Sequence, residues 1–415
     1  MKLFYYKDQN KPINYFETNE QVVIPNEYIE KPVRAFWVST VENIDLPIMN
    51  DEKEYKKLLD EIIENANKFN INTIFFQVRP LNDAFYKSNL NPYSRYLTGK
   101  EGLEPKFDVL KYIIDQAKKS NIEIHAWCNP YRVSRPIGDL SKDQYLDTLD
   151  NLNFAKKHKE LVIMDENKQL ILNPTKEEVK QFIIESMLEI LKNYDVKGIH
   201  WDDYFYPYAK LSEEYNDLKE YENRINKDQS LGDFRREHVT DVIKRLHKAV
   251  KNYNKDLEFG VSPFGIWQSK YNNEKGSNTA RNTSASYSNQ YADTYLWVKE
   301  EYIDYIIPQL YWEFGHPLAP FADLTKWWAS VVRGTNVKLY IGHASYRLGK
   351  EGEFENVDEV SNQLKYANNY KEVSGNVFFT YKNFKNIEVS KEGMESIRKT
   401  MNKDKEKAWK NTLKK

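Results

Sequence analysis

Short apolar runs alternate with longer amphipathic segments along most of this chain. Eight of the runs are nearly continuous in aliphatic and aromatic residues and are bounded by polar or turn-forming residues. Such runs are typical of parallel strands that are buried on both faces. The predicted strands are Arg34–Thr40, Thr73–Pro80, Glu123–Pro130, Lys197–Asp203, Glu258–Pro263, Tyr305–Trp312, Lys338–His343 and Asn376–Tyr381.

The segments between these runs have the period of amphipathic helices. In the first of them, Tyr55, Leu59, Ile62 and Phe69 fall on one face of a helix. Asp51 stands before this helix as a candidate N-cap. The predicted helices are Asp51–Asn70, Phe107–Ser120, Lys176–Tyr194, Phe234–Tyr253, Thr294–Tyr302, Phe321–Val332, Val357–Tyr370 and Lys391–Met401.

Eight strands that alternate with helices predict an α/β fold of the (β/α)8 TIM-barrel type. An open doubly wound sheet is the alternative, but it usually has fewer strands and a glycine-rich first turn, and no Gly-x-Gly-x-x-Gly occurs here. Residues 206–232 and 268–292 follow strands and predict long βα loops. We expect an N-terminal extension (1–33) packed on the barrel, one barrel domain (34–400) and a flexible lysine-rich tail (401–415).

Composition and charge narrow the range of partners. The 61 basic residues balance 62 acidic ones, with a net charge of -1, which gives no reason to expect a nucleic-acid partner. No run approaches the roughly 20 apolar residues of a membrane span. The first residues lack the apolar stretch of an export signal, so the location is left open. Cys128 is the lone cysteine, which excludes a disulfide framework.

The segment Gly198–Pro207 carries the most informative chemistry. It reads Gly-Ile-His-Trp-Asp-Asp-Tyr-Phe-Tyr-Pro and places two adjacent acids, Asp202 and Asp203, at a predicted strand end among aromatic residues. Burying two acids costs desolvation and mutual repulsion, which proteins accept mostly where the charge is used. Aromatic rings stack on sugar faces and paired carboxylates cleave glycosidic bonds. The segment therefore predicts a sugar-processing site.

The other predicted strands also end in polar and aromatic side chains. In a barrel, functional residues gather at these C-terminal ends. If strand alternation holds, six polar side chains point inward and form a cup at the barrel mouth. These are Gln77, Arg79, His125, Asn129, His200 and Asp202. Asp203 follows Asp202 directly, so in a regular strand its side chain points to the opposite face. It therefore either turns into the cup at the strand's end or caps a neighbouring loop.

Several of these segments together resemble a known bacterial family. It is the glycosyl-hydrolase-like family ten, long described as a domain of unknown function. The resembling segments appear in family order and include His-Ala-Trp-Cys-Asn-Pro-Tyr-Arg at 125–132. They are Arg34–Pro47, Asn72–Pro80, His125–Arg132, Leu172–Pro174, Gly198–Pro207, Pro308–Trp312 and the Gly-Asn-Val-Phe-Phe-Thr-Tyr segment from Gly375.

This resemblance implies a TIM-barrel glycoside hydrolase of the bacterial envelope, acting on a polysaccharide, chiefly peptidoglycan strands. It also implies an envelope-associated or secreted location. The family motifs place eight residues around the site, namely Arg79, His125, Asn129, Asp202, Asp203, Gln309, Tyr311 and Trp312. The motifs do not settle the second catalytic carboxylate, and Glu313 is a candidate by its position alone.

Each candidate residue has an expected role. Asp202 is expected to be the nucleophile or base, with Asp203 or Glu313 as the proton donor. The expected sugar platforms are Trp127, Tyr204, Tyr311 and Trp312. The residues expected to bind sugar substituents are Arg79, His125, Asn129, His200 and Gln309.

Two other functional classes stay open. A metal-dependent deacetylase or amidase acting on the same polymer would use His125, His200 and Asp202 as ligands. The chain has no His-Glu-x-x-His motif, and we expect no metal or other cofactor. A non-catalytic glycan-binding barrel is the second alternative.

Overall fold

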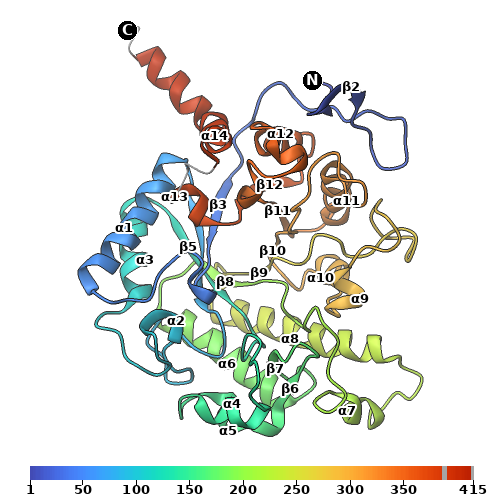
Figure 1. The fold of residues 1–415 in the computed structure, drawn as a ribbon. Coiled ribbons are helices and arrows are strands. Elements are labelled where there is room, and N and C mark those ends of the chain that lie inside the picture. Colours follow the sequence, from blue (N-terminus) through green and yellow to red (C-terminus); the bar gives the residue numbers. More distant parts are fainter. Residues whose placement is uncertain (386–389, 413–415) are drawn as a thin grey trace.

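In the computed structural model, eight parallel strands close into one barrel (Figure 1). Residues 1–385 and 390–412 are described, the last ten of them (403–412) by their backbone alone. The strands are β3 (Val33–Val38), β4 (Thr73–Arg79), β5 (Glu123–Cys128), β8 (Gly198–Trp201), β9 (Glu258–Val261), β10 (Tyr305–Ile306), β11 (Lys338–His343) and β12 (Val373–Phe378). They follow one another around the barrel in chain order, and β12 pairs back onto β3. The predicted TIM barrel is confirmed.

Helices surround the strands on the outside (Figure 1). Those that follow the barrel strands in turn are α1 (Glu52–Lys68), α3 (Val109–Lys119), α6 (Glu177–Asn193), α8 (Leu231–Tyr253), α10 (Thr294–Lys299), α11 (Phe321–Val332), α12 (Glu359–Ala367) and α14 (Lys391–Thr412). Asp51 caps α1 as expected, accepting a hydrogen bond from the Glu54 amide. The N-cap residues of α6 and α8 are Lys176 and Ser230, and the Ser230 side chain accepts a hydrogen bond from the Asp233 amide.

The strand predicted over Tyr305–Trp312 is much shorter than expected. Regular pairing covers only Tyr305–Ile306, and Gln309 adds isolated bridges to its two neighbours, at Phe264 and Gly342. Pro308 has no N–H to offer β11, so the ladder is interrupted at that residue. The chain beyond Pro308 is therefore irregular, and strand alternation no longer decides which way its side chains point.

Aromatic side chains fill the barrel interior. Trp37, Phe75, Trp127, Tyr305 and Tyr340 belong to one buried cluster there. Tyr305 enters the centre because β9 carries glycine opposite it: a Cβ at residue 260 would lie 2.2 Å from the Tyr305 ring. Such a packed interior closes the lower part of the barrel, so a ligand can enter only at its mouth.

Two small sheets and several short helices decorate the barrel. The two-stranded sheets are β1 (Phe4–Tyr5) with β2 (Asp8–Pro12), and β6 (Val162–Met164) with β7 (Leu170–Leu172). The short α-helices are α2 (Arg95–Thr98), α4 (Lys142–Thr148), α5 (Phe154–Lys157), α7 (Leu218–Glu222), α9 (Ser286–Asn289) and α13 (Tyr381–Lys385). Short 3₁₀ turns cover Val41–Asn43, Lys159–Leu161, Ser345–Arg347 and Gly352–Glu355. The predicted long loops at 206–232 and 268–292 carry α7 and α9.

Both chain ends contact the barrel's helical layer. The amide of Phe16 donates to Asp323 at the start of α11, and the amide of Tyr6 donates to Glu353 at 2.8 Å. Met401 and Asn402, assigned to a flexible tail from the sequence, are buried inside α14. The division at residues 33 and 400 otherwise stays a prediction, and residues 413–415 lie outside the described part. Among the described helices, none combines the length and apolar character needed to cross a bilayer.

Candidate active site

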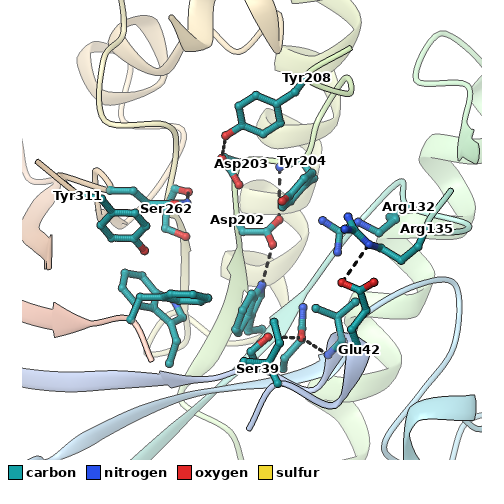
Figure 2. A pocket seen from close by; sticks show the side chains of 17 residues that line it. Ser39, Glu42, Arg132, Arg135, Asp202, Asp203, Tyr204, Tyr208, Ser262 and Tyr311 are labelled. Atoms are coloured by element: carbon teal, nitrogen blue, oxygen red, sulfur yellow. Dashed lines mark hydrogen bonds and ion pairs between the residues drawn. The ribbon is translucent and has the colours of Figure 1, made fainter. Parts of the chain in front are cut away.

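A cavity of about 340 Å³ opens at the C-terminal end of the barrel (Figure 2). Its walls come from the ends of most barrel strands and the loops that follow them. The lining residues are Trp37, Ser39, Val41, Glu42, Ile44, Gln77, Trp127, Arg132, Arg135, Asp202, Asp203, Tyr204, Tyr208, Ser262, Gln309, Tyr311 and Phe379. Carboxylates, arginines and aromatic rings therefore share one small space.

Both members of the acid pair reach this pocket. Strand β8 ends at Trp201, so Asp202 and Asp203 lie just beyond the regular strand. Consecutive residues in a strand point to opposite faces, but this constraint ends with the strand. Figure 2 shows Asp203 turned up toward Tyr208, with Asp202 below it. Of the two possibilities left open for Asp203, the structure shows the turn into the cup.

Asp202 receives several hydrogen bonds. The Asn129 side-chain amide donates to both carboxylate oxygens, at 2.8 and 2.7 Å, and the Trp127 indole donates to Oδ2 at 3.2 Å. The Tyr204 amide donates to Oδ1 at 3.4 Å. Hydrogen bonds to the charged form favour ionisation. Burial raises the pKa of the Asp202 carboxyl, while the charge of Arg132 and these donors oppose the rise.

The orientation of Asn129 follows from a chain of amides. The Gln77 oxygen accepts from the backbone amides of Thr40 and Val41, both at 2.8 Å. Its nitrogen must then be the donor to Asn129 Oδ1, at 2.8 Å. The Asn129 nitrogen is consequently the atom that faces Asp202. The loop after β3 thus orients the Gln77 side chain, which in turn orients Asn129 so that its N–H groups donate to the ionised Asp202.

Asp203 has a different environment. Tyr208 donates a hydrogen bond to its Oδ2 (Figure 2). Burial raises the pKa of the Asp203 carboxyl to about 7, the neighbouring Asp202 carboxylate adds to the rise, and the Tyr208 hydrogen bond opposes it. Because Asp202 has more donors and lies near Arg132, the first proton leaves Asp202. One carboxylate and one protonated carboxyl then share the pocket, the arrangement used in acid–base chemistry on a glycosidic bond.

Comparison with known proteins decides the family. The profile of the family described as Glycosyl hydrolase-like 10 matches residues 32–358. The chain belongs to this family. Glycosyl hydrolase YngK of Bacillus subtilis is 35% identical over 367 residues, covering 86% of this chain and 69% of that protein. Glycosyl hydrolase DigH of Escherichia coli K12 is 32% identical over 368 residues, covering 84% and 83% respectively.

A solved structure supports the fold alone. The α-L-fucosidase isoenzyme 2 from Paenibacillus thiaminolyticus superposes with a TM-score of 0.51 and 12% sequence identity. The match covers 91% of this chain and 49% of the fucosidase. At this identity the likeness supports the barrel fold of the chain and says nothing about its reaction.

Two histidines of the predicted cup lie deeper in this glycosyl hydrolase-like barrel. The Trp37 indole donates to His200 Nε2 at 3.1 Å, so Nε2 is the acceptor and Nδ1 carries the proton toward Tyr305. The Tyr305 hydroxyl in turn lies 3.2 Å from His125 Nδ1. Burial lowers the pKa of His125 to about 3 and that of His200 well below its usual value. Neither lines the pocket, so their predicted place at the mouth is wrong.

Arg79 is also displaced from its predicted position. The pairing of β4 with β5 slips between Gln77 and Arg79, so the bulge reverses the direction of the side chains that follow. The Arg79 guanidinium points out of the barrel, 5.5 Å from the Phe182 ring of α6. It donates to the backbone carbonyls of Asn129 and Pro130, at 2.6 and 3.2 Å. Arg79 therefore fixes the backbone of Asn129 and does not line the cup.

We predict that Arg79→Met destabilises the fold. The substitution keeps bulk but leaves two buried carbonyls without their donor, a loss on the order of 2–4 kcal/mol in the free energy of unfolding. Denaturant titration of the variant and the parent protein measures this difference. An unchanged midpoint and slope would show that these contacts contribute nothing to stability. Arg79→Lys serves as the matched variant, because it keeps the charge and loses the forked geometry.

The residues beyond Pro308 divide between the pocket and its surroundings. Gln309 and Tyr311 line the cavity, as predicted. Trp312 packs edge-on against Phe264 at 5.5 Å between ring centres and is absent from the lining. Glu313 also lies outside the lining and pairs with Arg347 at 3.3 Å. Both predictions assumed a regular strand through Trp312, whereas the pairing ends at Ile306.

Among the charged residues and tyrosines that line the cavity, four were not singled out from the sequence: Glu42, Arg132, Arg135 and Tyr208. Arg132 closes the motif His125–Arg132 that supported the family resemblance, so this motif was the signal that could have identified it. The other three lie on loops, where no periodicity reports their direction. Glu42 has a left-handed backbone, with φ of 51°, and loop strain of this kind often accompanies function.

No three His, Cys, Asp or Glu side chains converge as a metal site in the part of the chain that is described. His125 and His200 lie below the pocket floor and point toward Tyr305, whereas Asp202 faces the cavity. The ligand set of the deacetylase alternative is therefore not assembled by these residues.

Proposed function

We propose that this protein is a glycoside hydrolase acting on an amino-sugar glycan of the bacterial envelope, most specifically peptidoglycan strands. The observation that carries the proposal is the acid pair: Asp202 and Asp203 share one pocket, and their surroundings separate their pKa values. Paired carboxyls held in opposite protonation states are the working parts of a glycosidase.

In this mechanism Asp203 gives its proton to the glycosidic oxygen as the bond from that oxygen to the anomeric carbon breaks. Asp202 carries the negative charge. It either attacks the anomeric carbon to form a covalent intermediate or removes a proton from the attacking water. Glu313, the other candidate donor, is paired with Arg347 away from the cavity, which favours Asp203 for the acid role.

The aromatic walls support binding of a sugar. Trp127 and Tyr311 line the pocket and offer apolar surface to a pyranose ring. Tyr204 also lines it, but the Arg132 guanidinium stacks on one face of its ring at 3.7 Å. We therefore assign the main platforms to Trp127 and Tyr311. Asn129 acts on the glycan only through Asp202, because its donor atom is already engaged.

An amino-sugar substrate is supported by the family to which the chain belongs, since the family resemblance implies envelope glycans. The curated relatives from Bacillus subtilis and Escherichia coli are named glycosyl hydrolases, which agrees with the reaction class. The pocket chemistry agrees with any pyranoside that fits between the acid pair and the aromatic walls.

The test is digestion of purified peptidoglycan glycan strands followed by mass spectrometry. We expect new reducing ends with the wild-type protein and none above background with Asp202→Asn. Repeating the digestion after exhaustive chelation should leave the products unchanged. Release of acetate or of peptides with intact glycan chains would instead support the deacetylase or amidase alternative. Binding without any product would support the non-catalytic barrel.

A further inference from the structure

The segment that follows Pro308 carries a pocket residue without the support of a regular strand. Regular pairing of β10 ends at Ile306, although the Leu310 amide still donates to the Gly342 carbonyl at 3.0 Å. Tyr311, which lines the cavity, comes directly after this contact. Backbone groups that are removed from water need partners, so other residues have to replace the missing ladder.

Two side chains from neighbouring elements supply such partners. Arg347 Nη1, in the 3₁₀ turn after β11, donates to the Tyr311 carbonyl at 2.9 Å. Gln363 of α12 donates to the Trp312 carbonyl at 3.1 Å. Figure 2 shows the Tyr311 ring across the cavity from Asp202. The wall that faces the acid pair is therefore held in place by side chains behind it.

Arg347 is itself restrained from two directions. Its guanidinium lies 4.5 Å from the centre of the Phe354 ring, and Phe354 is fully buried. Glu313 Oε2 lies 3.3 Å from Nη1, as an ion pair without the geometry of a hydrogen bond. The charge of Glu313 thus attracts the guanidinium while the Nη1 donor serves the Tyr311 carbonyl. Hydrogen bonds from a charged donor are stronger than neutral ones, so this contact restrains the Tyr311 backbone.

The other titratable groups near this ion pair leave it intact at neutral pH. Burial raises the pKa of Glu359 to about 8, so its carboxyl is protonated near pH 7. Glu353 accepts a hydrogen bond from a backbone amide of the N-terminal extension at 2.8 Å. Burial lowers the pKa of His316, although Glu313 opposes the shift, so the ring is neutral near pH 7. In the described part of the chain, Glu313 is the carboxylate that pairs with Arg347.

We propose that Arg347, held by Glu313, is a positioning residue that sets the Tyr311 ring in the pocket wall. The inference rests on the proposed glycosidase function, in which Tyr311 stacks on a sugar, and it gives Glu313 a role other than proton donor. Arg347 and Glu313 lie outside the cavity lining, so they act through the ring and not on the glycan. A misplacement of about 1 Å in a site can cost on the order of 10²-fold in rate.

A double-mutant cycle tests whether Arg347 acts through Tyr311. Arg347→Met should lower kcat/KM on glycan strands by about 10- to 100-fold. In a Tyr311→Ala background the same substitution should change kcat/KM by less than about twofold, because the ring that Arg347 positions is gone. Equal losses in both backgrounds would overturn the proposal. Arg333→Met removes a surface ion pair with Glu372 and is the matched control, which should leave kcat/KM unchanged.

Two further variants separate positioning from other roles. Arg347→Lys keeps a cation that can donate to the Tyr311 carbonyl, so it should recover part of the loss seen in Arg347→Met. Glu313→Gln should lower kcat/KM less than Arg347→Met does, and it should leave the loss of activity above about pH 7 unchanged. If that loss at high pH disappears in Glu313→Gln, Glu313 is the proton donor and its positioning role is wrong.

Hydrogen exchange measures the restraint without catalysis. In Arg347→Met the peptide covering residues 309–316 should exchange faster than in the wild-type protein, and in Arg333→Met it should not. Unchanged exchange in Arg347→Met would overturn the inference. If the wild-type protein cleaves no glycan strand, only the hydrolase proposal fails, and the exchange still decides whether Arg347 holds Tyr311. If Arg347→Met does not fold, Arg347→Lys and Glu313→Gln make the same comparison.

Discussion

Asp202→Asn is expected to lower kcat on a cleavable glycan by about 10³-fold or more. The amide keeps the shape of the side chain but removes the charge that attacks the anomeric carbon or activates water. Asn129 and Trp127 both donate to this carboxylate, so their donors would face an amide in the variant. Single-turnover rates on defined oligosaccharides measure the loss at the chemical step.

The unfolding midpoint of Asp202→Asn is the control for this prediction. Burial raises the pKa of Asp202, so removing a buried charge should not reduce stability much, and a folded but inactive variant is expected. Turnover close to the wild-type value would remove Asp202 from the catalytic role while leaving the barrel and its family unaffected.

Asp203→Asn is expected to have an effect that depends on the leaving group. On an ordinary glycosidic bond kcat/KM should fall by about 10²- to 10⁴-fold, because the leaving oxygen no longer receives a proton. On an aryl glycoside with an electron-poor phenol the loss should be less than about tenfold, since that oxygen leaves without protonation. Kinetics on the two substrates measure the difference. Equal losses on both would assign Asp203 a structural role.

The pH dependence of activity tests the same role of Asp203 as the general acid. The pKa of Asp203 is raised to about 7, and a general acid works only while it is protonated. Activity should therefore be retained below about pH 7 and lost as the pH rises through that value. Asp203→Asn should abolish this basic limb. Tyr208→Phe is the matched variant: it removes the hydrogen bond that lowers the pKa of Asp203, so the limb should move to higher pH.

The amino-acid sequence by itself determined the class of fold. Buried parallel strands have to be apolar on both faces, and their connecting helices on one face, so the alternation of the two patterns is visible without any tertiary information. The eight strands and their order around the barrel follow from that alternation. The acid pair was equally visible, because two adjacent acids after an apolar run are costly to bury. Residues at the ends of the predicted strands were also placed at the mouth, and four of them line the pocket: Trp127, Tyr204, Gln309 and Tyr311.

Only the tertiary structure decided where individual side chains point at the mouth. Strand alternation predicts direction as long as the backbone is regular, and a single bulge turned Arg79 out of the barrel. The end of pairing before Pro308 removed the basis for placing Glu313. Depth along a barrel strand is set by register, which left His125 and His200 below the pocket. Arg132 and Tyr208 approach the acids from loops without periodicity, and their positions follow from long-range contacts that no local pattern encodes.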